Sequence, residues 1–168
     1  MLYIVDMNVK YKKYEKYINY IVNDIKPPYF MYMRDHYGLK DNECELVLSK
    51  VFNQPVTIKD NRVYGSNHNK IYFEDSNGFW FKREYDQNNN KIYFEDSNGF
   101  WVNREYDIND NEIYYEDSDG DWIKYEYDTN GNKIYQEDST GYWIKKEFDS
   151  NGNLIYVEDS DGKIRDYR

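Results

Sequence analysis

A repeat of 21 residues constrains the fold of this chain more than any other sequence feature. The pattern Ile-Tyr-x-Glu-Asp-Ser begins five times at this fixed spacing, at Ile71, Ile92, Ile113, Ile134 and Ile155. Each full unit adds a glycine, a tryptophan and a Glu-Tyr-Asp or Glu-Phe-Asp triplet at constant offsets, and the short last unit has Ile164 in place of tryptophan. A fixed period of this length indicates a repeat architecture in which each unit packs mainly on its neighbours.

Each unit has the pattern of a β-hairpin. β-branched and aromatic residues alternate with polar ones over six or seven positions, which is typical of strands. The first turn, from Asp75 to Gly78, has Asp first and Gly fourth, and we expect a three-residue loop with positive φ at the glycine. The second turn centres on pairs that tolerate positive φ, such as Asn88-Asn89 and Asn130-Gly131, and predicts a two-residue type I′ turn.

These two turn types keep every repeat position on one face of the sheet, because one loop is odd in length and the other even. The register that follows gives one apolar face, on which Phe73 lies opposite Phe81, Ile71 opposite Arg83 and Tyr85 opposite Ile92. The other face is aromatic and charged, with Tyr72 opposite Lys82, Glu74 opposite Trp80 and Lys70 opposite Glu84.

The N-terminal third differs from the repeats and predicts helices. Apolar residues at helical spacing follow Asn8 up to Pro27, a second helix runs from Tyr29 to Tyr37 before Gly38, and a third begins after Asp41. In the third helix we expect Leu46, Val47, Val51 and Phe52 to be buried. The predicted fold is α+β: a helical region, residues 1–55, followed by an elongated, twisted antiparallel sheet of hairpins, residues 56–168. The helices are expected to cover the apolar sheet face at its N-terminal end.

Composition narrows the function classes. With 32 acidic and 22 basic residues the formal net charge is −10, which argues against direct binding of nucleic acid or of an anionic membrane. No apolar run approaches the roughly 18 residues of a membrane helix, and the first residues do not read as a signal peptide, so we expect a cytoplasmic protein, in the host cell if it is phage-encoded. The single cysteine, Cys44, excludes an internal disulfide.

The segment Tyr127-Asp128-Thr129-Asn130-Gly131-Asn132, followed by Ile134, Asp138 and Gly141, resembles the YD repeat of RHS-type proteins, and the resemblance extends from about Val63 to the C-terminus. In that family the repeats form β-hairpins in a long sheet. The resemblance implies the hairpin and supplies no catalytic residue. The aromatic hairpins also look like choline- and glucan-binding repeats, but no Trp-Tyr dipeptide occurs here.

No residue pattern predicts an enzyme, a metal site or a cofactor. The Asp-rich turns, such as 149–153, are too short for a calcium loop and are explained by turn chemistry. His36, His68 and Cys44 are the only candidates for a nucleophile and base, and they are not close in sequence. Glu74 and Glu84 share a face, yet they recur in every unit and fit cross-strand ladders better than a glycosidase pair.

The aromatic and charged face is the predicted binding surface, although its rings can equally serve to shield a single-layer sheet. We expect a non-enzymatic protein-binding module whose partner has a basic surface, such as a phage-encoded inhibitor of a bacterial defence enzyme, with nucleic-acid mimicry as one route. A carbohydrate-binding repeat is the alternative, and the helices around Tyr32, Arg34 and His36 are the next place to search. The oligomeric state stays open. The predicted site residues are Tyr72, Glu74, Trp80, Glu84, Tyr93, Glu95, Trp101, Glu105, Tyr114, Glu116, Trp122, Glu126, Tyr135 and Trp143.

Overall fold

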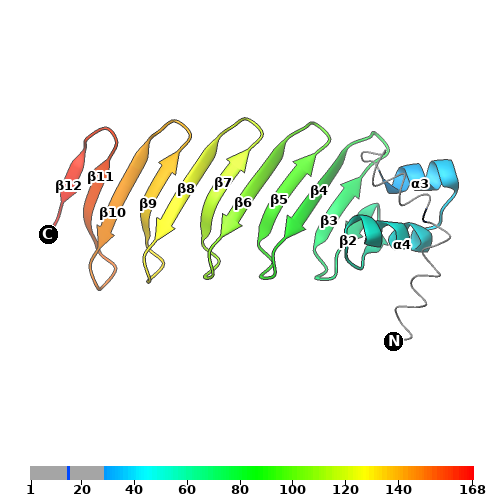
Figure 1. Cartoon of the computed structure of the whole chain (residues 1–168), viewed down its shortest axis with the longest axis horizontal. Helices are drawn as coiled ribbons and strands as arrows, with labels where there is room; N and C mark the ends of the chain where they lie inside the picture. The colour runs from blue at the N-terminus through cyan, green and yellow to red at the C-terminus, as the bar shows by residue number, and fades with distance from the viewer. Residues whose placement is uncertain (1–14, 16–28) are drawn as a thin grey trace. The chain divides into compact units, whose positions relative to one another are not determined.

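The computed structural model describes residue 15 and residues 29–168 (Figure 1). Two helices, α3 (Phe30–Tyr37) and α4 (Asp41–Val51), precede twelve strands. The strands are β1 (Thr57–Lys59), β2 (Arg62–Tyr64), β3 (Lys70–Glu74), β4 (Trp80–Tyr85), β5 (Lys91–Asp96), β6 (Trp101–Tyr106), β7 (Glu112–Asp117), β8 (Trp122–Tyr127), β9 (Lys133–Asp138), β10 (Trp143–Phe148), β11 (Leu154–Asp159) and β12 (Ile164–Asp166). The predicted fold class, helices followed by antiparallel hairpins, is confirmed, whereas the helix expected after Asn8 lies outside the described residues.

The chain forms two compact units. The first ends at Arg83 and includes residues 96–98, and the second contains residues 84–95 and 99–168. In the first unit, helices and strands share a core of Met33, Cys44, Val47, Leu48, Ile58, Val63 and Tyr72. The predicted domain boundary near residue 55 falls between α4 and β1 and stays a prediction.

α3 ends at the glycine, and α4 begins at the aspartate, that the sequence indicates. Gly38 terminates α3 with φ 61°, and its N–H donates to the carbonyl oxygen of Arg34 at 2.9 Å. The first turn of α4 is closed by Glu43, whose Oε2 accepts the N–H of Lys40 at 3.0 Å. Of the residues expected to be buried on α4 only Val47 is; Leu46, Val51 and Phe52 are half-buried, because the buried stripe is formed by Cys44, Val47 and Leu48.

The glycine turns are confirmed. The N–H of Asp75 donates to the Phe79 carbonyl at 2.9 Å, and Gly78 has φ 85°. The equivalent glycines at 99, 120 and 141 have φ between 83° and 85°. Each of these loops is therefore a three-residue loop in which glycine takes the left-handed position.

The prediction of a two-residue type I′ turn after each second strand is wrong. The N–H of Asp86 donates to the Asn90 carbonyl at 3.0 Å, and Asn89, at φ 70°, has the only positive φ in the loop. Asp86 Oδ1 accepts the N–H groups of Asn88 and Asn90 at 2.9 and 2.8 Å. The aspartate side chain thus stabilises a three-residue loop here as well, so both loops are odd in length.

A β-bulge in the second unit restores the parity that two odd loops would break. Glu105 lies opposite Tyr114, but Tyr106 lies opposite Glu112, so Ile113 is one residue in excess. The pairing predicted for Tyr85 and Ile92 is therefore wrong at its equivalent, Tyr106 and Ile113. Equivalent bulges occur where β8 pairs with β9 and where β10 pairs with β11. Residues at the same position of successive repeats therefore lie on one face of the sheet, as predicted. A bulge in each of these pairings, and not a loop of even length, keeps them there.

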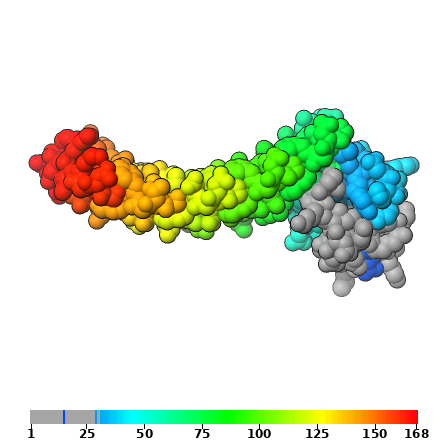
Figure 2. Space-filling model, turned by 90° about the horizontal axis from the view of Figure 1, so that it is seen from above, coloured from blue at the N-terminus to red at the C-terminus, as the bar shows by residue number. Residues whose placement is uncertain are grey.

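In the second unit the sheet is a single layer. Figure 2, where this part of the chain runs from green through yellow to red, shows it as a thin band with no second layer of described residues packed on it. Among its described residues, only Val102 and Asp117 are buried. Both faces of these hairpins are therefore accessible to solvent or to another molecule.

Candidate partner-binding face

The predicted site residues lie on one face of the hairpins, which we call the Tyr–Trp–Glu face. In the third repeat Tyr114 lies opposite Lys124, and Glu116 lies opposite Trp122. The first repeat has the same register, with Tyr72 opposite Lys82 and Glu74 opposite Trp80, as predicted. Alternation along each strand places the remaining predicted residues on this face within their own unit, namely Glu84, Tyr93, Glu95, Trp101, Glu105, Glu126, Tyr135 and Trp143.

The structure adds residues to this face that the sequence prediction missed. Glu137 and Glu147 belong to the same series in the fourth repeat, Tyr156 and Glu158 belong to it in the fifth, and Lys145 lies opposite Tyr135. Continuing the period of 21 residues from Glu116, Glu126 and Tyr135 to the end of the chain would have found these four residues.

Each tyrosine of this face is paired with the glutamate two positions along its strand. Tyr93 Oη donates to Glu95 Oε2 at 3.1 Å, and Tyr156 Oη donates to Glu158 Oε2 at 3.1 Å. Burial, and then the Glu95 charge and hydrogen bond, raise the pKa of Tyr93 to about 12. Burial and the neighbouring glutamate also raise the pKa of Tyr135. These tyrosines therefore remain neutral donors beside ionised carboxylates.

In the first unit this face is covered by the helices. Tyr72 and Glu74 are both 0% exposed. The Tyr29 N–H donates to Tyr72 Oη at 3.2 Å, Tyr72 Oη donates to Glu74 Oε2 at 2.6 Å, and the Met31 N–H donates to Glu74 Oε1. The rings of Tyr29 and Phe52 lie 5.3 and 5.8 Å from that of Tyr72. α3 and α4 therefore cover the Tyr–Trp–Glu face and not the apolar face on which the N-terminal helices were expected, and Tyr72 and Glu74 are not accessible to a partner. The helix predicted after Asn8 lies outside the described residues.

A valine explains why the helices pack on this side. Val63 lies opposite Tyr72 and is fully buried, and Ile58 lies opposite Val63. The second unit has Glu105 and Glu126 at the positions opposite Tyr114 and Tyr135. The first unit thus has an apolar patch on the Tyr–Trp–Glu face, whose burial is worth roughly 1.5–3 kcal/mol for each large side chain.

Glu74 also caps a helix. The N-cap residue of α3, Tyr29, makes no side-chain cap hydrogen bond, and the first turn of the helix has no acidic residue. The Glu74 carboxylate accepts one of the N–H groups that the helix cannot satisfy itself. A negative charge at this position stabilises a helix by about 0.3–2 kcal/mol. The sheet therefore supplies the cap that the helix sequence lacks.

The opposite, apolar face is shielded by cationic side chains. Phe73 and Phe81 stack with their centroids 5.5 Å apart, and the Arg83 guanidinium lies 4.4 Å from the Phe81 centroid. In the second unit Arg104 lies 5.2 Å from the Tyr115 centroid and pairs with Glu112 at 3.1 Å. Long stems and cation–π contacts thus cover part of these rings.

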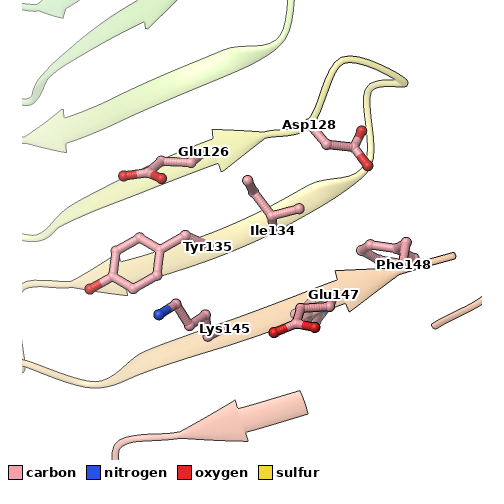
Figure 3. A pocket seen from close by; sticks show the side chains of 8 residues that line it. Glu126, Asp128, Ile134, Tyr135, Lys145, Glu147 and Phe148 are labelled. Atoms are coloured by element: carbon pink, nitrogen blue, oxygen red, sulfur yellow. The ribbon is translucent and has the colours of Figure 1, made fainter. Parts of the chain in front are cut away.

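Charges of both signs alternate along the accessible part of the Tyr–Trp–Glu face. One row across the strands contains Glu105, Tyr114, Lys124, Glu137 and Trp143. The next row contains Glu126, Tyr135, Lys145 and Glu158. Figure 3 shows Glu126, Tyr135 and Lys145 side by side on β8, β9 and β10, where they help to line a depression of about 600 Å³.

Cys44, His36 and His68, the residues considered for catalysis, occupy positions that structural roles explain. Burial raises the pKa of the Cys44 thiol to about 12, which disfavours the reactive thiolate. His36 stacks on Tyr32 at 4.1 Å, and His68 lies in a turn with φ 58°. In the part of the chain that the structure describes, no three His, Cys, Asp or Glu side chains are grouped to hold a metal ion. Nor is any helix of that part long and apolar enough to cross a membrane.

No family model and no curated protein matches the chain. Similarities are found only among solved structures. The chain is similar to part of the Tc holotoxin pore of Photorhabdus luminescens, with a TM-score of 0.48 and 14% identity over 62% of this chain and 7% of that chain. It is also similar to part of a TcdB2–TccC3 structure, with a TM-score of 0.47 and 12% identity over 60% of this chain and 6% of that chain. A third similarity is to S. aureus TarM, with a TM-score of 0.26 and 18% identity over 82% of this chain and 27% of that chain. The chain spans less than a tenth of the first two structures, and all three scores are too low to assign a function.

Proposed function

We propose that this chain is a non-enzymatic protein-binding module, built on a YD-type hairpin repeat, that binds its partner through the Tyr–Trp–Glu face of the second unit. One observation carries the proposal: in the first unit the same face, with the same register, packs against polypeptide. Tyr72 and Glu74 bind backbone N–H groups of α3, and Phe52 packs on the Tyr72 ring. The equivalent residues of later repeats have the same chemistry in an accessible setting.

The charges of the face favour a partner with a basic surface. Glu105, Glu126 and Glu147 are exposed at successive repeats, and carboxylates in such an array attract cationic groups and accelerate association. A phage-encoded inhibitor of a bacterial defence enzyme belongs to this class. Nucleic-acid mimicry is less favoured than ordinary protein recognition, because Lys124 and Lys145 interrupt the rows of carboxylates.

A carbohydrate-binding repeat is the second candidate, and the tryptophan environment argues against it. The Lys124 amine lies 4.8 Å from the centroid of the Trp122 ring. One of the two faces on which a sugar could stack on that ring is thus already in contact with a cation. Protein recognition, in which tryptophan and paired charges contribute together, fits this arrangement better.

The test has two stages. Affinity purification of the full chain from bacterial lysate, with mass spectrometry, identifies a partner, and binding kinetics then compare two kinds of variant. Trp101→Ala and Trp122→Ala are expected to speed dissociation and cost about 2 kcal/mol or more. Glu95→Gln and Glu116→Gln are expected to slow association and flatten its salt dependence. Gln136→Ala, on the opposite face and outside the depression of Figure 3, is the control.

Indifference of a partner to all four changes would contradict the proposal and direct attention to Tyr32, Arg34 and His36. Tryptophan fluorescence that responds to a panel of glycans, with no captured protein, would favour the carbohydrate candidate.

A further inference from the structure

The Tyr72–Glu74 pair is a receptor for the first turn of an α-helix. Its two acceptors bind two N–H groups at the start of α3: Tyr72 Oη accepts that of the N-cap residue Tyr29, and Glu74 Oε1 accepts that of Met31, two residues further on. The Tyr72 hydroxyl in turn donates to Glu74 Oε2, which holds both acceptors in place. The carboxylate charge lies at the end of the helix where the backbone dipoles leave a partial positive charge.

The same constellation recurs outside the first unit. Tyr114, Glu116, Trp122 and Lys124 have the register of Tyr72, Glu74, Trp80 and Lys82, and so do Tyr135, Glu137, Trp143 and Lys145. In the last unit only the pair recurs: the Tyr156 hydroxyl donates to Glu158, while Ile164 and Asp166 lie where tryptophan and lysine lie in the other units. Each of these later pairs is half-buried, and in the described part of the chain no helix covers them.

We propose that the pairs Tyr114–Glu116, Tyr135–Glu137 and Tyr156–Glu158 are docking sites for helix N-termini of a partner protein. This inference rests on the proposed function and specifies the chemistry of the partner. The docked helix has no acidic residue and no side-chain cap in its first turn, as α3 has none. It carries basic side chains near that turn, because Glu105 and Glu126 occupy the place that Val63 has beside Tyr72.

The repeat spacing fits more than one docked helix. Neighbouring strands lie about 4.8 Å apart and successive residues about 3.4 Å apart along a strand, and the register places Tyr114 in line with Glu137, two positions from Tyr135. Equivalent pairs in successive repeats therefore lie about 12 Å apart, slightly more than the interaxial distance of about 8–10 Å between packed helices. Two adjacent helices that splay slightly at their ends can place their N-termini on successive Tyr–Glu pairs, which makes the end of a helical bundle the partner surface that this face suits.

The experiment uses the full chain and two synthetic helical peptides of about 18 residues, long enough to be helical in water. Both are rich in alanine and lysine and lack tryptophan. One begins Tyr-Phe-Met and has no cap, and the other begins with serine and has glutamate three residues later, so that it satisfies its own N–H groups. Binding is followed by the emission of the four tryptophans of the chain, which all lie on the Tyr–Trp–Glu face.

The uncapped peptide is expected to bind about tenfold or more tightly than the capped one. The triple variant Glu116→Gln, Glu137→Gln and Glu158→Gln should weaken its binding by about tenfold or more. Glu105→Gln, Glu126→Gln and Glu147→Gln together remove the same charge from the same face but no acceptor for the helix N–H groups, and should weaken the binding only by about threefold, through lost attraction to the lysines. Because glutamine still accepts the tyrosine hydrogen bond, the hairpins are retained, and far-UV circular dichroism checks this.

Tyr114→Phe, Tyr135→Phe and Tyr156→Phe form an independent set that removes the hydroxyl acceptor and should also weaken binding.

Equal affinity for the two peptides, or equal effects of the two glutamate variants, would overturn the inference, because the face would then recognise charge alone. Binding that is lost in Trp122→Ala and Trp143→Ala but unchanged in the Glu116, Glu137 and Glu158 variant would overturn it while leaving the proposed protein-binding function intact. Failure of both peptides to bind would also overturn it, and the proposed function would then depend on the partner kinetics described above.

Discussion

The Tyr72–Glu74 pair and the Tyr135–Glu137 pair have the same sequence pattern and the same register, yet their environments are opposite. Tyr72 and Glu74 are fully buried beneath α3 and α4. Tyr135 and Glu137 are half-buried on a single-layer sheet. The residue opposite the tyrosine distinguishes them, since it is Val63 in the first case and Glu126 in the second. The comparison shows that a repeat can provide one recognition element many times, while a single neighbouring residue decides which copy the chain covers itself.

Deleting the helices should have the largest effect. A chain without residues 1–50 loses the cover of Ile58, Val63 and Tyr72, and we expect its first unit to lose about 5 kcal/mol or more. Deletion of one repeat, residues 113–133, should leave a shorter folded protein, because hairpins contact mainly their neighbours. Circular dichroism melting and solubility compare the two chains. An unchanged melting temperature after the helix deletion would contradict the role given to α3 and α4.

Exchanging the residue opposite the tyrosine tests the comparison directly. Val63→Glu places an unpaired carboxylate in the helix-covered core and should destabilise the first unit by about 4 kcal/mol. Glu126→Val should change the stability of the second unit by less than about 0.5 kcal/mol, because the position is exposed. Hydrogen exchange of the amides of α3 and β9 measures both. Similar losses in the two variants would show that position 63 does not decide where the helices pack.

Removing the carboxylate from each Tyr–Glu pair should give a smaller difference in stability loss between the two units. Glu74→Ala leaves the Met31 N–H and the Tyr72 hydroxyl without their acceptor and should cost about 3 kcal/mol. Glu137→Ala should cost less than about 1 kcal/mol, since solvent replaces the lost partner. Chemical denaturation followed by hydrogen exchange of α3 checks the contrast. If Glu74→Ala leaves α3 protected, Glu74 is not its cap.

High pH should lower the stability of the first unit through the buried Tyr72. Burial, with the Glu74 charge and hydrogen bond, raises the pKa of Tyr72 above its ordinary value near 10. Between those two values the unfolded chain loses this proton and the folded chain keeps it, so the contribution of Tyr72 to the stability of the first unit is complete below pH 10 and falls by about 1.4 kcal/mol per pH unit above it. Stability measured from pH 10 to 11 should fall less steeply by about this amount in Tyr72→Phe than in the natural chain, in which the buried Cys44 thiol adds its own slope, with Tyr135→Phe as the control. An identical slope in all three would contradict the prediction.

Local signals explain what could be predicted from the sequence. The period of 21 residues located the hairpins, and alternation placed Tyr, Trp and Glu on one face, because side chains of a strand point to opposite sides in turn. Gly78 and Gly38 marked a loop and a helix end, since each position requires positive φ. The second loop was predicted wrongly because Asn-Asn and Asn-Gly pairs suit both a type I′ turn and the observed loop. The hydrogen bonds of the Asp86 carboxylate select between them.

The sequence by itself determined the repeat, the two faces of the sheet and the helices α3 and α4, because each depends on residues close together in the chain. Only the tertiary structure decided which face the helices cover, which Tyr–Glu pair is buried and where the bulges lie. The contacts responsible join Tyr29 and Met31 to Tyr72 and Glu74, 43 residues away. No periodic pattern reports on such a pairing, since Tyr72 and Glu74 are identical in sequence to the pairs that stay accessible, and burial depends on the apolar surface that Val63 and Ile58 add beside them.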